Sequence, residues 1–283
     1  MAEGHAVHGM AGRVRRLRGQ PGRSSGPVVE DFDPGLLDGL VVDDAEAHGK
    51  HLLVHVEGTA WSGHFHLGMH GAVSVRRHRR ALGEDGLPRS DPPVPAGLAW
   101  RFLTAAYLLQ ITRPTICELL DPAGVSALHE RLGPDPLRDD ADPEVAVARL
   151  HRSRRAVGLL LLDQSVVSGI GNVYRAELLW RARIDPHSPG SAVPVDALRA
   201  LWQDTIDLMT VGLGAGWIVT HPDQLVAARD LLVREEPVPR WRKNYAVYLR
   251  RGRPCPRCGA AVEAERMGLQ TAYWCSGCQV LHR

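Results

Sequence analysis

The sequence predicts an α+β fold with a strand-rich N-terminal part, a helical middle and a small cysteine-rich hairpin at the end. Three observations support this order. Residues 41–47 and 51–57 alternate apolar and polar side chains, at least in part, which is the pattern of half-buried strands. Residues 194–213 carry apolar side chains at helical spacing. Four of the five cysteines form two Cys-x-x-Cys pairs near the C-terminus.

Length and composition are those of a folded protein of two domains or one large one. The chain has 283 residues, is 44% hydrophobic and carries a formal net charge of +2. No apolar run reaches the roughly 18 residues that span a bilayer, and no apolar leader follows the N-terminus. We therefore expect a cytoplasmic protein without a membrane partner.

The basic residues are clustered although the net charge is small. A cluster of arginines on one face can bind phosphates, but each cluster taken alone is also typical of a solvated surface. The clusters lie in residues 13–23, 76–80, 149–155 and 240–253.

Residues 162–180 contain the most specific local pattern of the chain. An apolar run at residues 156–162 leads into a turn with Gly169 and Gly171, and Asn172 then opens a second apolar-periodic segment. Glycine allows a tight turn and asparagine is a good N-cap, so we expect a helix, a two-glycine turn and a second helix capped by Asn172. The amides at the start of that helix are a candidate phosphate site, and the alternative is a plain helical hairpin.

Residues 161–177 closely resemble the helix–two-turn–helix signature of the formamidopyrimidine-DNA glycosylase/endonuclease VIII (Fpg/Nei) family. The resemblance implies an N-terminal β-sandwich flanked by helices, a helical helix–two-turn–helix domain and a C-terminal zinc-ribbon hairpin. The implied boundaries are residues 1–132, 133–245 and 246–283, with a linker at residues 132–136. It also implies that Asn172 contacts a DNA phosphate.

The chain begins Met1-Ala2-Glu3. Removal of Met1 would expose the Ala2 α-amine, which is partly neutral near pH 7 and can form a Schiff base with a carbonyl carbon. Glu3 beside it can move protons, although an ordinary chain start is the alternative. The family resemblance assigns the nucleophile and the acid/base to these two positions. Glu3 matches the family glutamate, whereas Ala2 stands where the family has proline, which bears on the strength of the lyase step.

Lys50 and Lys243 are the only lysines among the 34 basic residues. Lysine can transfer a proton whereas arginine stays protonated, so a lysine in an arginine-rich chain suggests a specific function. Lys50 also lies in a Gly-Lys-x-Leu-Leu segment that resembles a turn of the family. The resemblance implies that Lys50 contacts a DNA phosphate and assists elimination.

Three further residues are candidates for DNA contact. Residues 64–75 predict strand, loop and strand, and the resemblance implies that the loop enters the duplex where a base has been flipped out. Met69 is long and flexible enough to be such a wedge, with His70 as a second one, and a buried core methionine is the alternative for Met69. By the same resemblance, Arg131 corresponds to a DNA-contacting arginine.

The pairs Cys255/Cys258 and Cys275/Cys278 are separated by 16 residues, a zinc-ribbon spacing. Four thiolates would bind one structural zinc ion, Zn²⁺, with no open position for catalysis, and nothing suggests the export that disulfides would require. In the family an arginine five residues before the third cysteine grips a phosphate. Gln270 stands there, which predicts weaker phosphate binding, and Arg266 is a possible substitute.

Further elements follow from local patterns and from the resemblance. The expected elements are a helix at residues 3–16, an irregular loop at 19–26, two strands within 98–120 with a turn near 104–106, a short helix at 121–131 and a helix starting at Asp142-Pro143.

The resemblance implies a base-excision repair enzyme acting on damaged double-stranded DNA as a monomer at the nucleoid. It would flip a damaged base, with oxidised pyrimidines favoured, cleave the glycosidic bond and nick the strand by β-elimination. Two alternatives remain open because of Ala2 and Gln270. One is a catalytically weakened lesion-binding protein, and the other is a monofunctional glycosylase for alkylated or crosslinked bases.

Overall fold

The computed structural model describes residues 2–283, which form two compact units. The first unit contains Ala2 and Val7–Arg131, and the second contains Glu3–Ala6 and Leu132–Arg283. Helix α1 (Gly4–Val14) therefore begins in the second unit and continues in the first. Among residues 2–283, no helix is both long and apolar enough to cross a bilayer.

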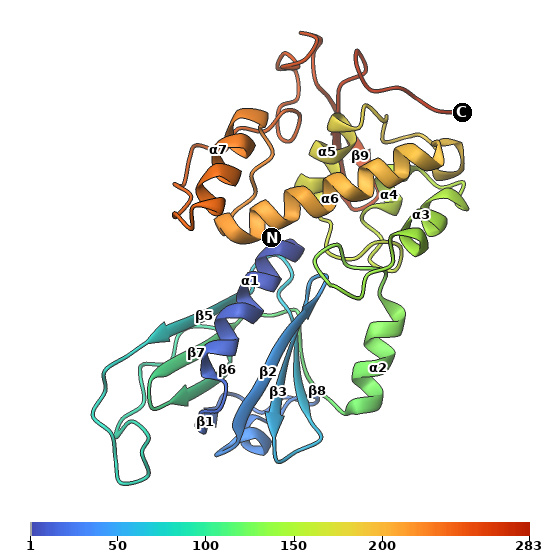
Figure 1. Cartoon of the computed structure of the whole chain (residues 1–283). Coiled ribbons are helices and arrows are strands. Elements are labelled where there is room, and N and C mark those ends of the chain that lie inside the picture. Colours follow the sequence, from blue (N-terminus) through green and yellow to red (C-terminus); the bar gives the residue numbers. More distant parts are fainter. Residues whose placement is uncertain (1) are drawn as a thin grey trace. The chain divides into compact units, whose positions relative to one another are not determined.

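Two antiparallel four-stranded sheets build the first unit (Figure 1). Their orders are β1-β6-β7-β5 and β2-β3-β4-β8. The strands are β1 (Gly22–Ser25), β2 (Val41–His48), β3 (His51–Glu57), β4 (Ser62–His66), β5 (Ala72–Arg77), β6 (Leu98–Thr104), β7 (Tyr107–Thr112) and β8 (Ile116–Leu120).

Side chains from both sheets share one core, which confirms the predicted β-sandwich. Phe65 of β4 and Trp100 of β6 stack with ring centroids 5.4 Å apart, and both are fully buried. Val7 and Val14 of α1 pack into the same core. A short 3-10 turn (Arg15–Leu17) follows α1, so the helix ends two residues earlier than expected.

The predicted irregular loop at residues 19–26 is wrong in part, because β1 (Gly22–Ser25) lies within it. This strand pairs with β6 and forms an edge of its sheet. Its sequence, Gly-Arg-Ser-Ser, has no apolar alternation, and Ser24 instead accepts a hydrogen bond from the Trp100 indole at 2.9 Å. Pairing with an existing sheet, and not intrinsic propensity, makes this segment a strand.

The second unit is mainly helical and ends in a two-stranded hairpin. Its longest helix, α6, packs against α3, α5 and α7 around one apolar core (Figure 1). The start of α3 is as predicted, since the Asp142 side chain accepts a hydrogen bond from the Glu144 N–H at 2.8 Å. The elements are α3 (Pro143–His151), α4 (Val157–Leu160), α5 (Asn172–Arg181), a 3-10 turn (Gly190–Ala192), α6 (Val195–Ala215), α7 (Pro222–Val233), β9 (Glu263–Met267) and β10 (Gln270–Trp274). Helix α2 (Pro122–Arg131) belongs to the first unit and follows β8.

The helix–turn–helix expectation is confirmed, but the predicted N-cap is wrong. Gly171, in extended conformation, is the N-cap residue of α5, and Asn172 is the first helical residue. No side chain of Gly171 exists to cap the helix, so the free amides at its start need another acceptor.

Candidate active site

A buried carboxylate supplies that acceptor at the start of α5. Glu3 is 2% exposed, and its carboxylate oxygens accept hydrogen bonds from three backbone N–H groups. Gly171 donates at 3.0 Å, Val173 at 2.9 Å and Tyr174 at 3.3 Å. Amide donors and the positive end of the helix dipole both stabilise an ionised carboxylate. The residue next to Ala2 is thereby held in one position.

Glycine is needed at two points of this contact. A Cβ atom on Gly171 would lie 2.4 Å from Cδ of Glu3, and one on Gly4 would lie 2.8 Å from Cα of Gly169. The Gly4 N–H also donates to the Gly169 carbonyl oxygen at 2.8 Å. A larger residue at either point would push residues 3–6 away from the glycine turn.

This arrangement corrects the expectation of a phosphate site at the start of α5. The amides expected to bind a phosphate donate to Glu3. The Asn172 side chain is likewise engaged, since Nδ2 donates to the Thr271 carbonyl oxygen at 3.1 Å and Oδ1 accepts a hydrogen bond from Arg175. In this structure Asn172 therefore contacts the β9–β10 hairpin within the same unit.

Arg175 is a site residue that sequence reasoning did not assign. It is 1% exposed, and it donates to the Thr271 carbonyl oxygen at 2.8 Å. Burial lowers its pKa to about 10, against the opposing effect of Glu3. The guanidinium thus links the start of α5 to the tip of the β9–β10 hairpin. Its position three residues after Asn172, on the same helix face, was the available signal.

Glu177, two residues further along α5, is a second site residue that the sequence did not assign. It is fully buried, and its carboxylate accepts hydrogen bonds from the N–H groups of residues 246–248 at 2.9, 2.9 and 3.0 Å. The Thr220 hydroxyl donates to it at 3.0 Å. Four donors compensate the cost of burying the charge, so Glu177 anchors the segment that enters the cysteine hairpin.

Burial and the charge of Glu3 raise the pKa of two tyrosines. The pKa of Tyr174 lies well above its ordinary value because of burial and then Glu3, and the same causes, with smaller ones, raise that of Tyr245 to about 12. Both phenols therefore stay protonated and can only serve as neutral hydrogen-bonding groups at this site.

Lys50 lies in the first unit, in the two-residue turn between β2 and β3. His48 and His51 face each other at the ends of the two strands, and Gly49 takes a positive φ of 58° between them. The pKa of His66 is lowered by burial first and by the Lys50 charge second. The Lys50 ammonium therefore lies within electrostatic range of the same end of the sheet.

The three other predicted contact residues of the first unit are accessible. Met69 is 61% exposed, which excludes the alternative of a core methionine. His70 and Arg131 are exposed as well. The structure leaves all three available to a partner.

The four predicted zinc ligands come together at the end of the second unit. The Sγ atoms of Cys255, Cys258, Cys275 and Cys278 lie within 4.8 Å of one another. Two of these pairs are 3.8 and 3.4 Å apart. Four sulfurs bound to zinc at 2.3 Å in a tetrahedron stand about 3.8 Å apart, so the residues fit such an ion. The Trp180 indole N–H also points at Cys255 Sγ, at 3.3 Å.

Gln270 opens β10 and pairs with Met267 across the hairpin. It is half-buried. The neighbouring Arg266 is exposed, and its Nε donates to the Gly268 carbonyl oxygen at 2.9 Å. The hairpin tip thus carries one cation, from Arg266 and not from position 270.

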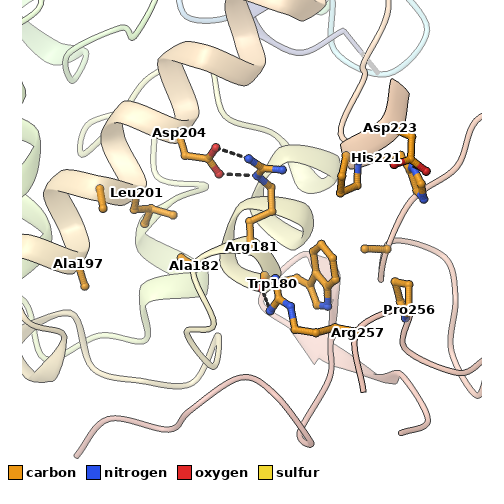
Figure 2. A pocket seen from close by; sticks show the side chains of 13 residues that line it. Trp180, Arg181, Ala182, Ala197, Leu201, Asp204, His221, Asp223, Pro256 and Arg257 are labelled. Carbon is orange, nitrogen blue, oxygen red and sulfur yellow. Dashed lines mark hydrogen bonds and ion pairs between the residues drawn. The ribbon is translucent and has the colours of Figure 1, made fainter. Parts of the chain in front are cut away.

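A cavity of about 760 Å³ lies elsewhere in the second unit. Figure 2 shows Arg181 pointing at Asp204 with two hydrogen bonds, of 2.6 and 2.7 Å, and Arg257 beside the Trp180 ring. The Arg257 guanidinium carbon is 4.1 Å from that ring centroid. The cavity lining contains none of the residues predicted for catalysis, DNA contact or zinc.

Comparisons with known proteins agree with the helix–two-turn–helix motif around residues 161–177. The sequence pattern of the "Formamidopyrimidine-DNA glycosylase H2TH domain" matches residues 132–222. The chain is 38% identical over 282 residues to "Endonuclease 8 1" of Mycobacterium tuberculosis, covering 99% of this chain and 100% of the relative. It is 32% identical over 257 residues to a "Formamidopyrimidine-DNA glycosylase" of Laribacter hongkongensis, covering 89% and 87%.

The fold is also that of solved structures. A Lactococcus lactis formamidopyrimidine-DNA glycosylase, non-covalently bound to DNA containing an AP site, superposes with a TM-score of 0.75 at 21% identity. The match covers 98% of this chain and 99% of that one. The same enzyme bound to DNA with N7-benzyl-Fapy-dG gives a TM-score of 0.74 at 22% identity, with the same coverage.

Proposed function

Because this chain belongs to the formamidopyrimidine-DNA glycosylase/endonuclease VIII family of DNA-repair proteins, we propose that it excises a damaged base from double-stranded DNA and nicks the strand by β-elimination. The observation that carries the proposal is the Glu3 carboxylate held by the α5 amides. Ala2 precedes Glu3 directly, so the peptide bond keeps an α-amine nucleophile next to a fixed proton carrier.

The proposed chemistry assigns one role to each residue. The Ala2 amine attacks C1′ of the damaged nucleotide, the glycosidic bond breaks, and the base leaves with a proton that Glu3 shuttles. A proton from Glu3 to O4′ then breaks the C1′–O4′ bond, which opens the sugar ring and leaves an imine between C1′ and the Ala2 nitrogen. Loss of a C2′ proton from this imine breaks the C3′–O bond, and Lys50 holds the departing phosphate. The step requires removal of Met1, which lies outside the described residues.

We propose Met69, His70, Arg131, Asn172 and Gln270 as the DNA contacts. The exposure of Met69 and His70 supports their use as wedges in the gap left by a flipped base. Asn172 would have to exchange part of its contact with Thr271 for a phosphate, or position the hairpin that contacts it.

We further propose one structural zinc ion on the four cysteines, oxidised pyrimidines as the substrate class, and a monomer acting at the nucleoid in the cytoplasm. Functionally, residues 1–132 would carry the amine and Lys50, residues 133–245 the helix–two-turn–helix motif, and residues 246–283 the zinc hairpin.

A second candidate function follows from Ala2 and Gln270. A primary amine in place of proline and an uncharged residue at the hairpin would weaken the lyase step more than the recognition of a lesion. The protein would then be a lesion-binding protein, or a monofunctional glycosylase for alkylated bases.

Borohydride trapping on a duplex with an abasic site tests these functions. The expected result is a covalent protein–DNA adduct that is lost when the α-amine is blocked and in Glu3→Gln. Intact mass of the same sample reports whether Met1 has been removed. Protein that lacks Met1, binds DNA and gives no adduct would refute the lyase and favour the second candidate.

A further inference from the structure

Helix α5 contacts the C-terminal segment, residues 246–283, at three levels. Near the start of the helix Arg175 donates to the Thr271 carbonyl oxygen, and further along Glu177 accepts from three backbone N–H groups of the segment. Trp180, in the last turn of the helix, makes the third contact, and this one reaches a proposed metal ligand directly. The last turn of α5 is therefore part of the surroundings of the cysteine cluster.

The Trp180 indole faces the sulfur of Cys255. Its Nε1 lies 3.3 Å from Cys255 Sγ, and both residues are buried, with exposed fractions of 5% and 3%. An indole N–H can only donate a hydrogen bond, so the sulfur is the acceptor. A thiolate that binds a metal ion keeps lone pairs and negative charge, so the indole can donate to Cys255 while the sulfur holds an ion.

Arg257, which lies between the two cysteines of the first pair, holds this indole in place. Its Cζ is 4.1 Å from the Trp180 ring centroid, a cation–π contact, and its Nη1 donates to the Trp180 carbonyl oxygen at 2.7 Å (Figure 2). The guanidinium thus contacts both the backbone and the ring of Trp180. These contacts oppose any rotation that would turn the indole N–H away from Cys255.

Arg257 also contacts the cysteine sulfurs itself. Its backbone N–H donates to Cys255 Sγ at 3.4 Å, and its Nη1 lies 3.9 Å from Cys278 Sγ. Four thiolates around one divalent cation leave a net negative charge at the site. A guanidinium stays protonated, so Arg257 places a permanent positive charge beside that negative charge.

Apolar packing alone does not account for the contact between Trp180 and the sulfur. Trp180 belongs to a small apolar cluster with Ala176, Val247 and Val262, and a phenylalanine ring would also pack there. A buried tryptophan of this unit does not need a partner for its N–H either. Trp202 is likewise 5% exposed, and its Nε1 has no hydrogen-bond partner among residues 2–283. The Trp180 N–H, by contrast, is directed at a metal-binding atom.

We propose that Trp180 and Arg257 form an outer shell of the metal site and determine how tightly the four cysteines retain their ion. Both are positioning residues, because Trp180 acts through Cys255, and Arg257 acts through Trp180 and through its charge beside Cys278. Since Trp180 belongs to α5, ion binding and the docking of the C-terminal segment on α5 stabilise each other. The inference rests on the zinc site proposed above.

Competition with a chromogenic chelator measures the zinc affinity of the full-length protein. Loss of one outer-shell partner typically lowers metal affinity by roughly 10–100-fold. Trp180→Phe keeps an aromatic ring but removes the N–H donor, so we expect its zinc affinity to fall about tenfold. Trp202→Phe is the matched control, because it makes the same change at equal exposure without losing a hydrogen bond. Equal zinc affinities in these two variants would overturn the proposal.

Arg257→Ala tests the shell without changing a buried aromatic residue, since Arg257 is only half-buried. The variant loses both the positive charge and the group that orients the indole, so we again expect zinc affinity to fall about tenfold. Arg251→Ala, at an exposed arginine shortly before the first cysteine, is its control. Parent-like zinc affinity in Arg257→Ala would also overturn the proposed shell.

Cobalt(II) in place of zinc supplies a readout that a general loss of stability would not change. Cobalt bound to thiolates absorbs light by charge transfer from sulfur to metal. Removal of a hydrogen bond raises the energy of the sulfur lone pair, so this band should move to longer wavelength in Trp180→Phe. The band of Trp202→Phe should stay at the parent position. A parent-like band in Trp180→Phe would contradict a hydrogen bond to Cys255 and so the proposal.

Elemental analysis of the purified parent protein separates this inference from the zinc site on which it rests. A parent protein that contains zinc, together with variants that all retain it equally, would refute the outer shell alone. A parent protein that binds neither zinc nor cobalt would refute the zinc site itself, and the outer shell with it.

Discussion

Oε1 of Glu3 accepts a hydrogen bond from the Val173 N–H at 2.9 Å, although 170 residues separate them. The contact lies within the second unit, which takes up Glu3–Ala6 from the N-terminus. The glycine turn that identifies the family in the sequence is therefore also what holds the proposed proton shuttle. A substitution in this turn therefore tests catalysis as well as folding.

Gly171→Ala should disable the site without unfolding the protein. Its Cβ would lie 2.4 Å from Cδ of Glu3, so the carboxylate must leave its three amide donors. Misplacement of a reacting group by about 1 Å can cost roughly a hundredfold in rate, and we expect a loss of that size in borohydride trapping. Gly12→Ala is the control, since no heavy atom lies within 4 Å of its Cβ. Parent-like trapping by Gly171→Ala would show that Glu3 is not held there for catalysis.

Glu177→Gln should destabilise the second unit. The carboxylate accepts four hydrogen bonds in a fully buried position, and an amide would turn a donor toward the N–H groups of residues 246–248. We expect the free energy of unfolding in urea to fall by about 3 kcal/mol. The exposed Glu236→Gln is the control. A change no larger than that of the control would mean that Glu177 does not anchor the hairpin.

Gln270→Arg should strengthen DNA binding through one added phosphate contact. The salt dependence of binding should become steeper by about 0.9 in the slope of log K against log salt. Fluorescence anisotropy with an abasic duplex at several salt concentrations measures this slope. A variant with the parent slope would place position 270 away from the DNA backbone.

The stability of the first unit should fall in mild acid. The pKa of His51 is about 3 in the folded protein, mainly because of burial, against an ordinary 6.5 in the unfolded chain. The unfolded state therefore binds more protons below pH 6.5, and stability is lost as the pH falls through that value. From this residue alone we expect a loss of about 2 kcal/mol at pH 5 relative to neutral pH.

Urea unfolding at both pH values checks this expectation, with His51→Gln as the comparison. The variant has no imidazole to protonate at this position, so its stability should depend less on pH. If parent and variant lost equal stability in acid, His51 would not be the titrating group.

Several features of this protein could be predicted because their signals are local. Three of these signals each lie within a short stretch of chain. They are the alternation along β2 and β3, the glycine pair 169/171 and the spacing of the four cysteines. Backbone geometry and the tetrahedral coordination of a metal by four cysteines then allow few structures for these stretches. The family resemblance extended these patterns to the sandwich and the order of its parts.

Other features depended on which segments meet. Strand β1 exists because β6 offers it an edge, and Asn172 is not a cap because Glu3 takes the amides that it would have served. Neither partner is near in sequence.

A hydrogen-bonded chain in the first unit shows the same division: Nδ1 of His64 lies 2.7 Å from Oε1 of Glu118, and Nε2 of His64 lies 2.8 Å from Nδ1 of His51. The sequence by itself determined that His51, His64 and Glu118 lie in or beside strands, on faces set by the period of two. Only the tertiary structure decided that they form one hydrogen-bonded chain, because strand order and register set which side chains become neighbours across a sheet.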